Sequence, residues 1–316
     1  MSNHPAAMLS PSKDTIAILA LSAAALFWSG NFIAGRALRD VLDPVALNWI
    51  RWVLCLAIFL PLVGARLLRH RRIVLREWKL LLGLGATGIA AFHTLVYQAL
   101  SETTAVNALL MLALAPALIM AGATLAGDSR PTPTQWSGCL VSLFGAAILV
   151  TRLDPGALRA LRINPGDLWM LGAVVVWAAY SLLLRRRPPD LPPDVALAGS
   201  MIAALALLTP VLAISAPSLP PVLGPIEIGA ILYIAIFASL IAFLLYSHGV
   251  ARIGAARAGQ FVNLMPVFGP VLAVLILGET IALSQITGAA CVFAGIVLVN
   301  RTDRSPATGK RMSILR

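Results

Sequence analysis

The chain has 316 residues, of which 59 % are hydrophobic and only 12 % are charged, and its mean hydropathy is +0.89. A soluble domain of this size needs more polar side chains to cover its surface, so the composition excludes one and indicates an integral membrane protein. The net charge of +11 does not indicate nucleic-acid binding, because the basic residues flank apolar segments and do not alternate with exposed aromatic side chains.

Ten apolar segments follow one another along the chain. A hydrocarbon core about 30 Å thick requires roughly 20 apolar residues in a helix, because backbone N–H and C=O groups have no water to bond there. We therefore predict membrane-spanning helices over residues 15–38, 44–63, 78–100, 104–126, 134–151, 168–184, 195–213, 226–249, 255–277 and 281–299.

The Lys and Arg residues divide unevenly between the connecting segments. If the N-terminus is cytoplasmic, the inside segments hold 18 of these residues and the outside loops hold 5. Cytoplasmic loops of membrane proteins carry an excess of positive charge. We therefore expect both termini in the cytoplasm, with cytoplasmic tails over 1–14 and 301–316.

The two halves of the sequence repeat one another at an offset of about 150 residues. Ala105 to Pro116 aligns with Ala255 to Pro266 without a gap, and Trp28 falls on Trp177 at an offset of 149. The repeat predicts two five-helix domains, 15–151 and 168–300, joined by a loop over 152–167. Because five is odd, the second half must enter the membrane from the opposite side. The predicted fold class is all-α integral membrane, with ten transmembrane helices in two inverted-topology five-helix repeats.

Inverted halves place a substrate site at their interface near the membrane midplane and favour alternating access. Pro116 and Pro266 occupy matching mid-span positions, where each kinks its helix. The kink is either a fixed curve or a bending point used in gating. Two glycine pairs also match between the halves, and the spacing of seven residues within each pair predicts close helix packing: Gly138 with Gly145, and Gly288 with Gly295.

Charged side chains are rare inside the predicted helices. All 13 carboxylates fall in loops, tails or helix ends, which argues against proton exchange through a membrane-embedded Asp or Glu. Arg51 lies about two turns into the second helix, between Trp49 and Trp52. We favour snorkelling of Arg51 to the outer interface or its pairing with Asp43, and contact with an anionic substrate group is the alternative.

His93 lies well inside the third helix and shares a face with Tyr97, four residues on. It is either a neutral side chain hydrogen-bonded between helices, or a functional group that contacts a substrate carboxylate or acts as a proton-sensitive gate. The cysteines, Cys55, Cys139 and Cys291, lie in apolar segments without metal-ligand spacing. We therefore expect no metal site, no cofactor and no disulfide framework.

Aromatic and amide side chains supply the candidate substrate site. Trp28 and Asn31 share one helix face, and Trp177 and Tyr180 repeat the same spacing in the second half. An aromatic face attracts an ammonium group by about 0.5 to 2 kcal/mol, and amides can bind carboxylates or amines without a buried charge. An ordinary aromatic helix interface is the alternative. The candidate substrate-binding residues are Trp28, Asn31, His93, Tyr97, Trp177, Tyr180, Tyr246, Gln260 and Asn263.

Three segments have a recognisable pattern: Ala-Leu-Phe-Trp-Ser-Gly-Asn-Phe at residues 25–32, Ala105 to Pro116 running on to Gly127-Asp128, and Ala255 to Pro266 running on to Gly278-Glu279. In these segments the chain resembles the drug/metabolite transporter superfamily, in its EamA-type ten-helix branch. The resemblance covers residues 15–300 and is strongest to a bacterial amino-acid exporter. It implies efflux of aromatic and other neutral amino acids. Asp128 stands where the branch usually has Glu.

We therefore predict a transporter of a small-molecule substrate, neutral or aromatic amino acids, in the bacterial inner membrane, and a monomer fits this prediction. Without an embedded carboxylate, uniport is favoured. The alternative to uniport is proton coupling through His93. The alternative to amino-acid export is export of amphipathic drugs or other metabolites, which could also be proton-coupled. A polytopic membrane enzyme is a remote one, because no set of catalytic side chains can be placed at one depth.

Overall fold

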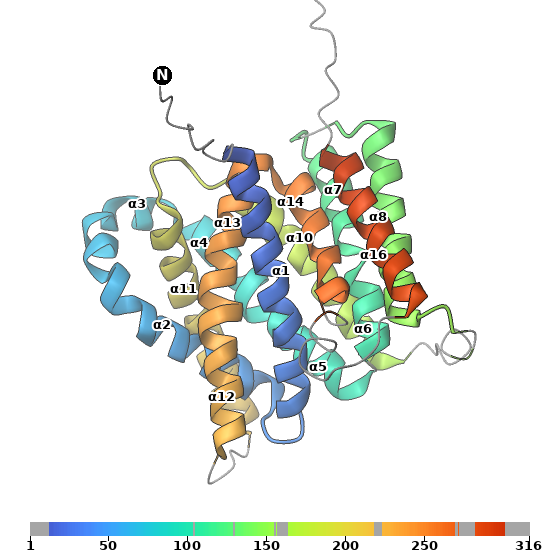
Figure 1. Ribbon diagram of the computed structural model, residues 1–316. Coiled ribbons are helices and arrows are strands. Elements are labelled where there is room, and N and C mark those ends of the chain that lie inside the picture. The colour runs from blue at the N-terminus through green and yellow to red at the C-terminus, as the bar shows by residue number, and fades with distance from the viewer. Residues whose placement is uncertain are drawn as a thin grey trace, which may run out of the picture.

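The computed structural model describes residues 13–103, 105–128, 130–154, 156, 164–217, 223–268, 271 and 282–300. These residues form helices and connecting turns and contain no β-strand (Figure 1). Nine helical segments among them are long and apolar enough to cross a membrane. The predicted helix over 255–277 is described continuously only as far as Phe268. Gly278-Glu279, residues 1–12, the C-terminal tail and half of the predicted loop over 152–167 lie outside the described residues, whereas Lys13 and Asp14 of the predicted N-terminal tail belong to α1. The all-α fold class is confirmed.

The first half contributes five spanning segments, of which the third and fourth are composite. Its elements are α1 (Lys13–Leu38), α2 (Pro44–Arg69), α3 (Arg71–Arg76), α4 (Trp78–Leu84), η1 (Gly85–Ala91), α5 (Phe92–Glu102), α6 (Ala105–Leu112), α7 (Ala115–Leu125) and α8 (Pro133–Thr151). The second half follows the same order. Its elements are α10 (Pro165–Arg185), α11 (Pro193–Ser215), α12 (Pro225–Tyr233), η2 (Ile234–Ile241), α13 (Ala242–Ile253), α14 (Ala255–Gly259), η3 (Gln260–Leu264) and α16 (Leu283–Asn300).

Local sequence explains where several helices begin. Asp43 caps α2, because its carboxylate accepts hydrogen bonds from the amides of Val45 and Ala46. Thr132 with Gln135 forms a reciprocal capping box at the start of α8, and Asn164 with Asp167 forms another at α10; all three helices carry proline in their first turn.

The third spanning segment of each half contains a π-helix. The segments η1, in α4–η1–α5, and η2, in α12–η2–α13, occupy matching positions in the repeat, because Gly85 and Ile234 are 149 residues apart. A π-helical turn holds an extra residue, so it rotates the side chains that follow and is frequent at functional sites. His93 and Phe243 are the second residues after the ends of η1 and η2.

The fourth spanning segment of each half departs from α-helix next to its proline. The first half breaks between α6 and α7, just before Pro116, and the second half narrows to the 3₁₀ segment η3, just before Pro266. Proline has no N–H for the preceding turn, which accounts for the irregularity at both places. Their role as bending points stays a prediction.

The fifth spanning segments, α8 and α16, pack directly against each other at one edge of the bundle (Figure 1). A Cβ atom on Gly145 would lie 2.7 Å from the carbonyl oxygen of Gly288, and one on Gly295 would lie 2.4 Å from that of Gly138. No side chain fits at either place, so the predicted close packing of the glycine pairs is confirmed. The two helices run antiparallel, so Gly138 faces Gly295 and Gly145 faces Gly288.

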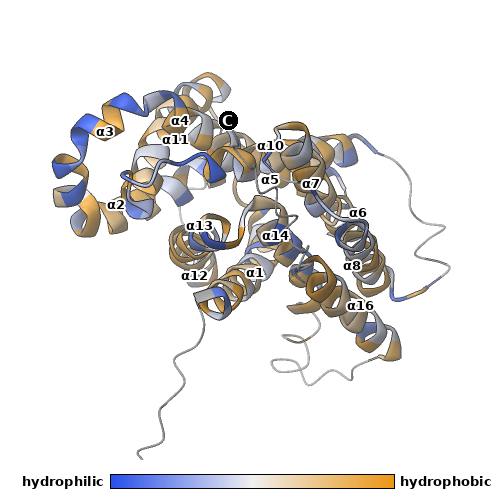
Figure 2. Ribbon diagram, turned by 90° about the horizontal axis from the view of Figure 1, so that it is seen from above, coloured by the Kyte–Doolittle hydropathy of each residue, from blue (hydrophilic) through white to orange (hydrophobic). Residues whose placement is uncertain are grey.

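Other helix contacts also join the two halves reciprocally. Helix α1 packs against α13, and α10, which matches α1, packs against α5, which matches α13. Helices α2 and α11 pack against each other at the opposite edge from α8 and α16 (Figure 2). This is the pattern that two halves related by a twofold axis produce.

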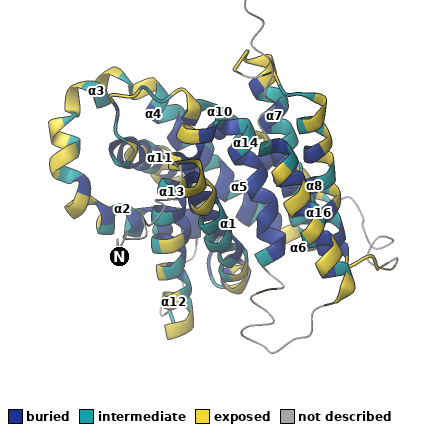
Figure 3. Cartoon of the chain, turned by 45° about the horizontal axis from the view of Figure 1, so that its top comes forward, coloured by how far each residue is buried: buried dark blue, intermediate teal, exposed yellow. Residues whose placement is uncertain are grey.

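Burial separates a core from a lipid-facing surface. The described parts of α5, α10 and α13 form the buried middle of the bundle, whereas α3 and the start of α12 are exposed (Figure 3). Large apolar side chains are also exposed on the outer helices, as expected for a surface that faces lipid; they include Leu62, Leu140, Phe144, Ile214 and Phe293.

Candidate functional site

Aromatic side chains from both halves meet in the middle of the bundle. Trp28 and Trp177, which occupy the same repeat position, lie edge to face with ring centroids 5.1 Å apart. Tyr246 packs on both tryptophans at 5.2 Å, and Tyr180 packs on Trp177 at 5.1 Å. The structure therefore brings these four predicted residues together across the interface of the halves.

Three further aromatic residues complete this group: Trp52 and Phe92, which were not predicted as site residues, and Phe243, whose spacing from Tyr246 suggests the same aromatic wall. Phe92 packs on Trp177 with centroids 4.8 Å apart, and Phe243 lies 5.2 Å from Trp52. His93 contacts Phe243 at 5.8 Å. We call the following residues the central cluster: Trp28, Trp52, Phe92, His93, Trp177, Tyr180, Phe243 and Tyr246. Phe243 also stands at the repeat position that matches His93.

A small cavity of about 20 Å³ lies beside the cluster and has room for roughly one water molecule. Four predicted residues line it, Trp28, Asn31, His93 and Trp177, together with apolar side chains that include Leu112, Val262 and Met265. An amino acid does not fit in this volume. The structure therefore represents a conformation in which the centre of the protein is closed.

A fully buried guanidinium lies beside the cluster. Arg51 is 0 % exposed, and it donates hydrogen bonds to Ser239 Oγ at 2.9 and 2.6 Å and to Tyr97 Oη at 2.6 Å. Its third neutral partner is Asn31 Oδ1 at 3.2 Å, and its guanidinium carbon lies 5.4 Å from the centre of the Trp52 ring. No described carboxylate forms an ion pair with it.

The favoured interpretation of Arg51 was wrong. Its guanidinium points into the protein and does not snorkel, because neutral hydrogen-bond partners from α1, α5 and η2 converge on it. Asp43 is already used as the cap of α2. A buried cation that is held by neutral groups alone favours an anion strongly when one reaches it, since charge-assisted bonds replace neutral ones.

Several polar atoms in the cluster also lack a protein partner. His93 Nδ1 and Trp177 Nε1 are buried without a hydrogen bond among the described residues. By contrast, Trp28 Nε1 donates to the carbonyl oxygen of Ala238 at 3.0 Å, and the hydroxyls of Tyr246 and Ser181 lie 2.9 Å apart. Unpaired buried donors and acceptors are costly, so a ligand that satisfies them gains affinity.

Two predicted site residues lie away from the cluster. Asn263 donates from Nδ2 to Ser142 Oγ of α8 at 2.9 Å, and Gln260 is fully buried on the same short helix. Neither lines the central cavity. The structure thus brings together seven of the nine predicted residues, with Tyr97 joined through Arg51 and Asn31, and leaves these two at the packing of η3 against α8.

One carboxylate is more buried than the sequence indicated. Asp167, at the start of α10, is 6 % exposed and accepts hydrogen bonds from Thr103 Oγ1 at 2.7 Å and from Asn107 Nδ2 at 3.2 Å. It also accepts from the backbone N–H of Asn164 at 3.1 Å. Because these bonds tie the start of α10 to the fourth spanning segment, Asp167 has a structural role at the end of the bundle and not in the cluster.

Known proteins match this chain over most of its length. The EamA-like transporter family matches residues 15–151 and 164–301. The uncharacterized transporter YyaM of Bacillus subtilis is 31 % identical over 226 residues, which cover 71 % of this chain and 73 % of that protein. A probable terminal-alkyne amino-acid exporter of Streptantibioticus cattleyicolor is 26 % identical over 292 residues, which cover 92 % and 95 %.

A solved crystal structure has a TM-score of 0.73 to this fold at 25 % identity, with 90 % of this chain and 96 % of the other covered. The family and the names of the relatives indicate a multi-pass membrane transporter and not an enzyme. Both halves match the same family model separately, as the internal repeat requires. The chain belongs to the EamA-like transporter family.

Proposed function

We propose that the chain exports aromatic and other neutral amino acids, and that the substrate binds in the central cluster. The observation that carries this proposal is the fully buried Arg51, whose described partners are all neutral. A substrate carboxylate that displaced Tyr97 and Asn31 would form a charge-assisted, two-pronged contact with the guanidinium. The aromatic rings would receive the substrate side chain and, by cation–π attraction, its ammonium group.

The remaining candidate contacts agree with a zwitterionic substrate. Asn31, His93 and Trp177 line the cavity next to the guanidinium, and the last two offer buried nitrogen atoms that have no described partner. Tyr180 and Tyr246 form the far aromatic wall against Trp177. The relative in Streptantibioticus cattleyicolor is named as a probable amino-acid exporter, which supports the same substrate class.

Transport proceeds by alternating access of two inverted halves in this proposal. The halves meet at Trp28 and Trp177, and each contains a π-helix and a proline at matching positions. The cluster is too closed to hold substrate, so the halves must separate on one side to admit it and on the other to release it. We place both termini in the cytoplasm and the protein in the bacterial inner membrane, as the distribution of Lys and Arg indicates.

Uniport is the proposed mode. The described residues of the central cluster and its cavity include no Asp or Glu that could carry a proton in exchange for substrate. Export of cationic amphipathic drugs fits the site less well, because the guanidinium of Arg51 repels a cation from the centre of the bundle. If protons were coupled to transport through His93, the transport mode would no longer be uniport, but the substrate would still bind in the central cluster.

Release of radiolabelled phenylalanine, threonine and methionine from proteoliposomes tests the proposal. We expect release that depends on the protein and is unaffected by an imposed proton gradient. Acceleration by the gradient would replace uniport with proton coupling and make His93 the first residue to substitute. Release of none of the three amino acids, together with efflux of dyes, would contradict amino-acid export.

A further inference from the structure

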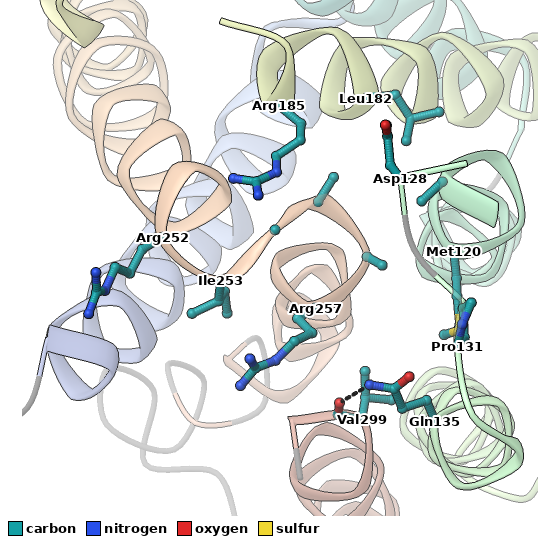
Figure 4. Close-up of a pocket in the computed structure, with 14 residues that line it drawn as sticks. Met120, Asp128, Pro131, Gln135, Leu182, Arg185, Arg252, Ile253, Arg257 and Val299 are labelled. Atoms are coloured by element: carbon teal, nitrogen blue, oxygen red, sulfur yellow. Dashed lines mark hydrogen bonds between the residues drawn. The ribbon is translucent and has the colours of Figure 1, made fainter. Parts of the chain in front are cut away.

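A second and larger cavity opens at the end of the bundle where α1 begins and α16 ends. It measures about 270 Å³ and lies between the halves (Figure 4). Arg185 of α10, Arg252 of α13 and Arg257 of α14 line one side, and Asp128 and Gln135 lie across from them (Figure 4). The distribution of Lys and Arg places this end at the cytoplasm.

The cavity carries a net positive charge. Arg252 is paired with Asp14, at 3.2 Å between Nε and Oδ1. Arg185 and Arg257 have only neutral described hydrogen-bond partners: the former donates to the carbonyl oxygen of Ala251 at 3.2 Å, and the latter to the side-chain and backbone oxygens of Asn300 at 3.0 and 3.1 Å. Two guanidinium groups are therefore available to an anion, and Asp128 balances one of them at most.

Three spanning segments contribute residues to both cavities: α6–α7, α10 and α14–η3. On α10, Leu182 borders the arginine cavity and Trp177 borders the central cavity. These residues are five positions apart, which is roughly 8 Å along a helix. On α14–η3, Arg257 borders the arginine cavity and Val262 borders the central one. The two cavities thus follow one another along the interface of the halves.

A thin apolar layer separates them. The side chain of Ile119 fills the space above Gly259, where a Cβ would lie 2.8 Å from its Cδ1 atom. The side chain of Leu182 does the same at Gly122, with a distance of 2.6 Å. Ile119 and Gly259 stand between the residues that border the two cavities on their own segments. A path along these two segments from one cavity to the other therefore passes Ile119 and Leu182.

We propose that the arginine cavity is a second binding site, at which Arg185 and Arg257 hold the carboxylate of an amino acid before it passes Ile119 and Leu182 to the central cluster. This inference rests on the proposed function and adds a first binding step to it. The ligand class is a carboxylate of a small zwitterion. An acidic lipid headgroup offers the same anionic chemistry, so the experiment must separate the two sources.

Cysteine labelling in inside-out membrane vesicles tests the site without transport. Ala256→Cys places a thiol in the cavity, in a chain whose native cysteines, Cys55, Cys139 and Cys291, are changed to alanine. We expect a membrane-impermeant anionic methanethiosulfonate to react about tenfold faster than a cationic one, after correction for their rates with a free thiol, because two nearby cations attract it. Phenylalanine should slow labelling, and phenylalaninamide, which lacks the carboxylate, should not.

The double variant R185Q/R257Q should lose both the preference for the anionic reagent and the protection by phenylalanine. R185K/R257K keeps the charge and should retain the preference. The matched control is R71Q/R72Q, which removes two exposed arginines of α3 at the same side of the membrane and should change neither result. An unchanged preference in R185Q/R257Q would overturn the proposal.

Transport kinetics and lipid composition complete the test. In proteoliposomes of phosphatidylcholine alone, R185Q/R257Q should raise the KM for phenylalanine export about tenfold and change the maximal rate less than twofold. If R185Q/R257Q raised the KM only when acidic lipids were present, the inference would be overturned, and the cavity would instead bind a lipid headgroup. Normal KM in R185Q/R257Q would overturn it while leaving the central site intact, whereas absence of transport by the unmodified protein would contradict the proposed function itself.

Discussion

Arg51 and Ser239 join the two halves of the protein at the centre of the bundle. The guanidinium donates two hydrogen bonds to the Ser239 hydroxyl, at 2.9 and 2.6 Å. That hydroxyl in turn donates to the carbonyl oxygen of Ile234, five residues earlier in η2, at 2.8 Å. Because the bond spans the wide turn of the π-helix, the unusual helix geometry positions the group that holds the buried cation.

The first prediction concerns Arg51. Arg51→Gln should lower amino-acid export at least about 30-fold, because the loss of one partner from a buried charge pair costs roughly 2–5 kcal/mol. Arg51→Lys should retain part of the activity, since the charge stays but the two-pronged geometry is lost. Proteoliposome efflux of phenylalanine measures both variants.

Ser239→Ala is the control for Arg51. It removes a neutral hydrogen-bond partner and leaves the cation in place, so export should fall by much less than in Arg51→Gln. Thermal unfolding of each purified variant checks that the fold is retained. Export by a folded Arg51→Gln at the rate of the unmodified protein would show that the guanidinium does not bind the substrate.

The second prediction concerns the aromatic wall. Trp177→Ala should reduce export at least tenfold, because the ring contacts Trp28, Phe92 and Tyr246 around the closed cavity. Trp169→Ala is the matched control: it lies on the same helix, is 44 % exposed on the outer surface and should leave export nearly unchanged. Equal losses in both folded variants would mean that the ring acts only through general stability.

Much of the fold could be predicted from the sequence because the membrane imposes strong rules on a chain. Segment length and hydropathy predicted the spanning helices, and the spacing of Gly138 and Gly145 predicted close helix packing, which the structure shows between α8 and α16. The 149-residue offset between Trp28 and Trp177 also put two tryptophans at one repeat position, and the structure brings them into contact. Their role in binding substrate remains a prediction.

The position of Arg51 could not be predicted from local rules. A lone cation two turns into a helix can snorkel, and only the tertiary structure shows that Ser239, Asn31 and Tyr97 converge on it. The π-helices could not be predicted, because an apolar segment of this length is assumed to be an α-helix with 3.6 residues per turn. The position of Gln260 away from the central cluster could not be predicted either. Hydropathy does not fix the rotation of a helix that is buried on most sides.

The third prediction tests the contact between α8 and α16. Gly295→Ala should lower the apparent stability by about 1–3 kcal/mol, because the added methyl group meets the Gly138 carbonyl oxygen and the helices must separate. Gly229→Ala, in α12, is the control, since a Cβ there meets no atom within 4 Å. Thermal unfolding in detergent compares the two. Equal stability of both variants would contradict close packing at this edge.

The last prediction concerns Pro116. Alanine at this position restores an N–H that can bond to the preceding turn, so α6 and α7 can join into one straight helix. If the break is a bending point, Pro116→Ala should keep or raise thermal stability while it slows export several-fold, because the halves must flex to expose the site in turn. Pro61→Ala is the matched control: it removes a proline from the interior of α2, on an exposed face, and should leave export unchanged. Unimpaired export by Pro116→Ala would show that the kink at this proline is fixed and is not a bending point. The π-helices would then be the next segments to test for a role in gating.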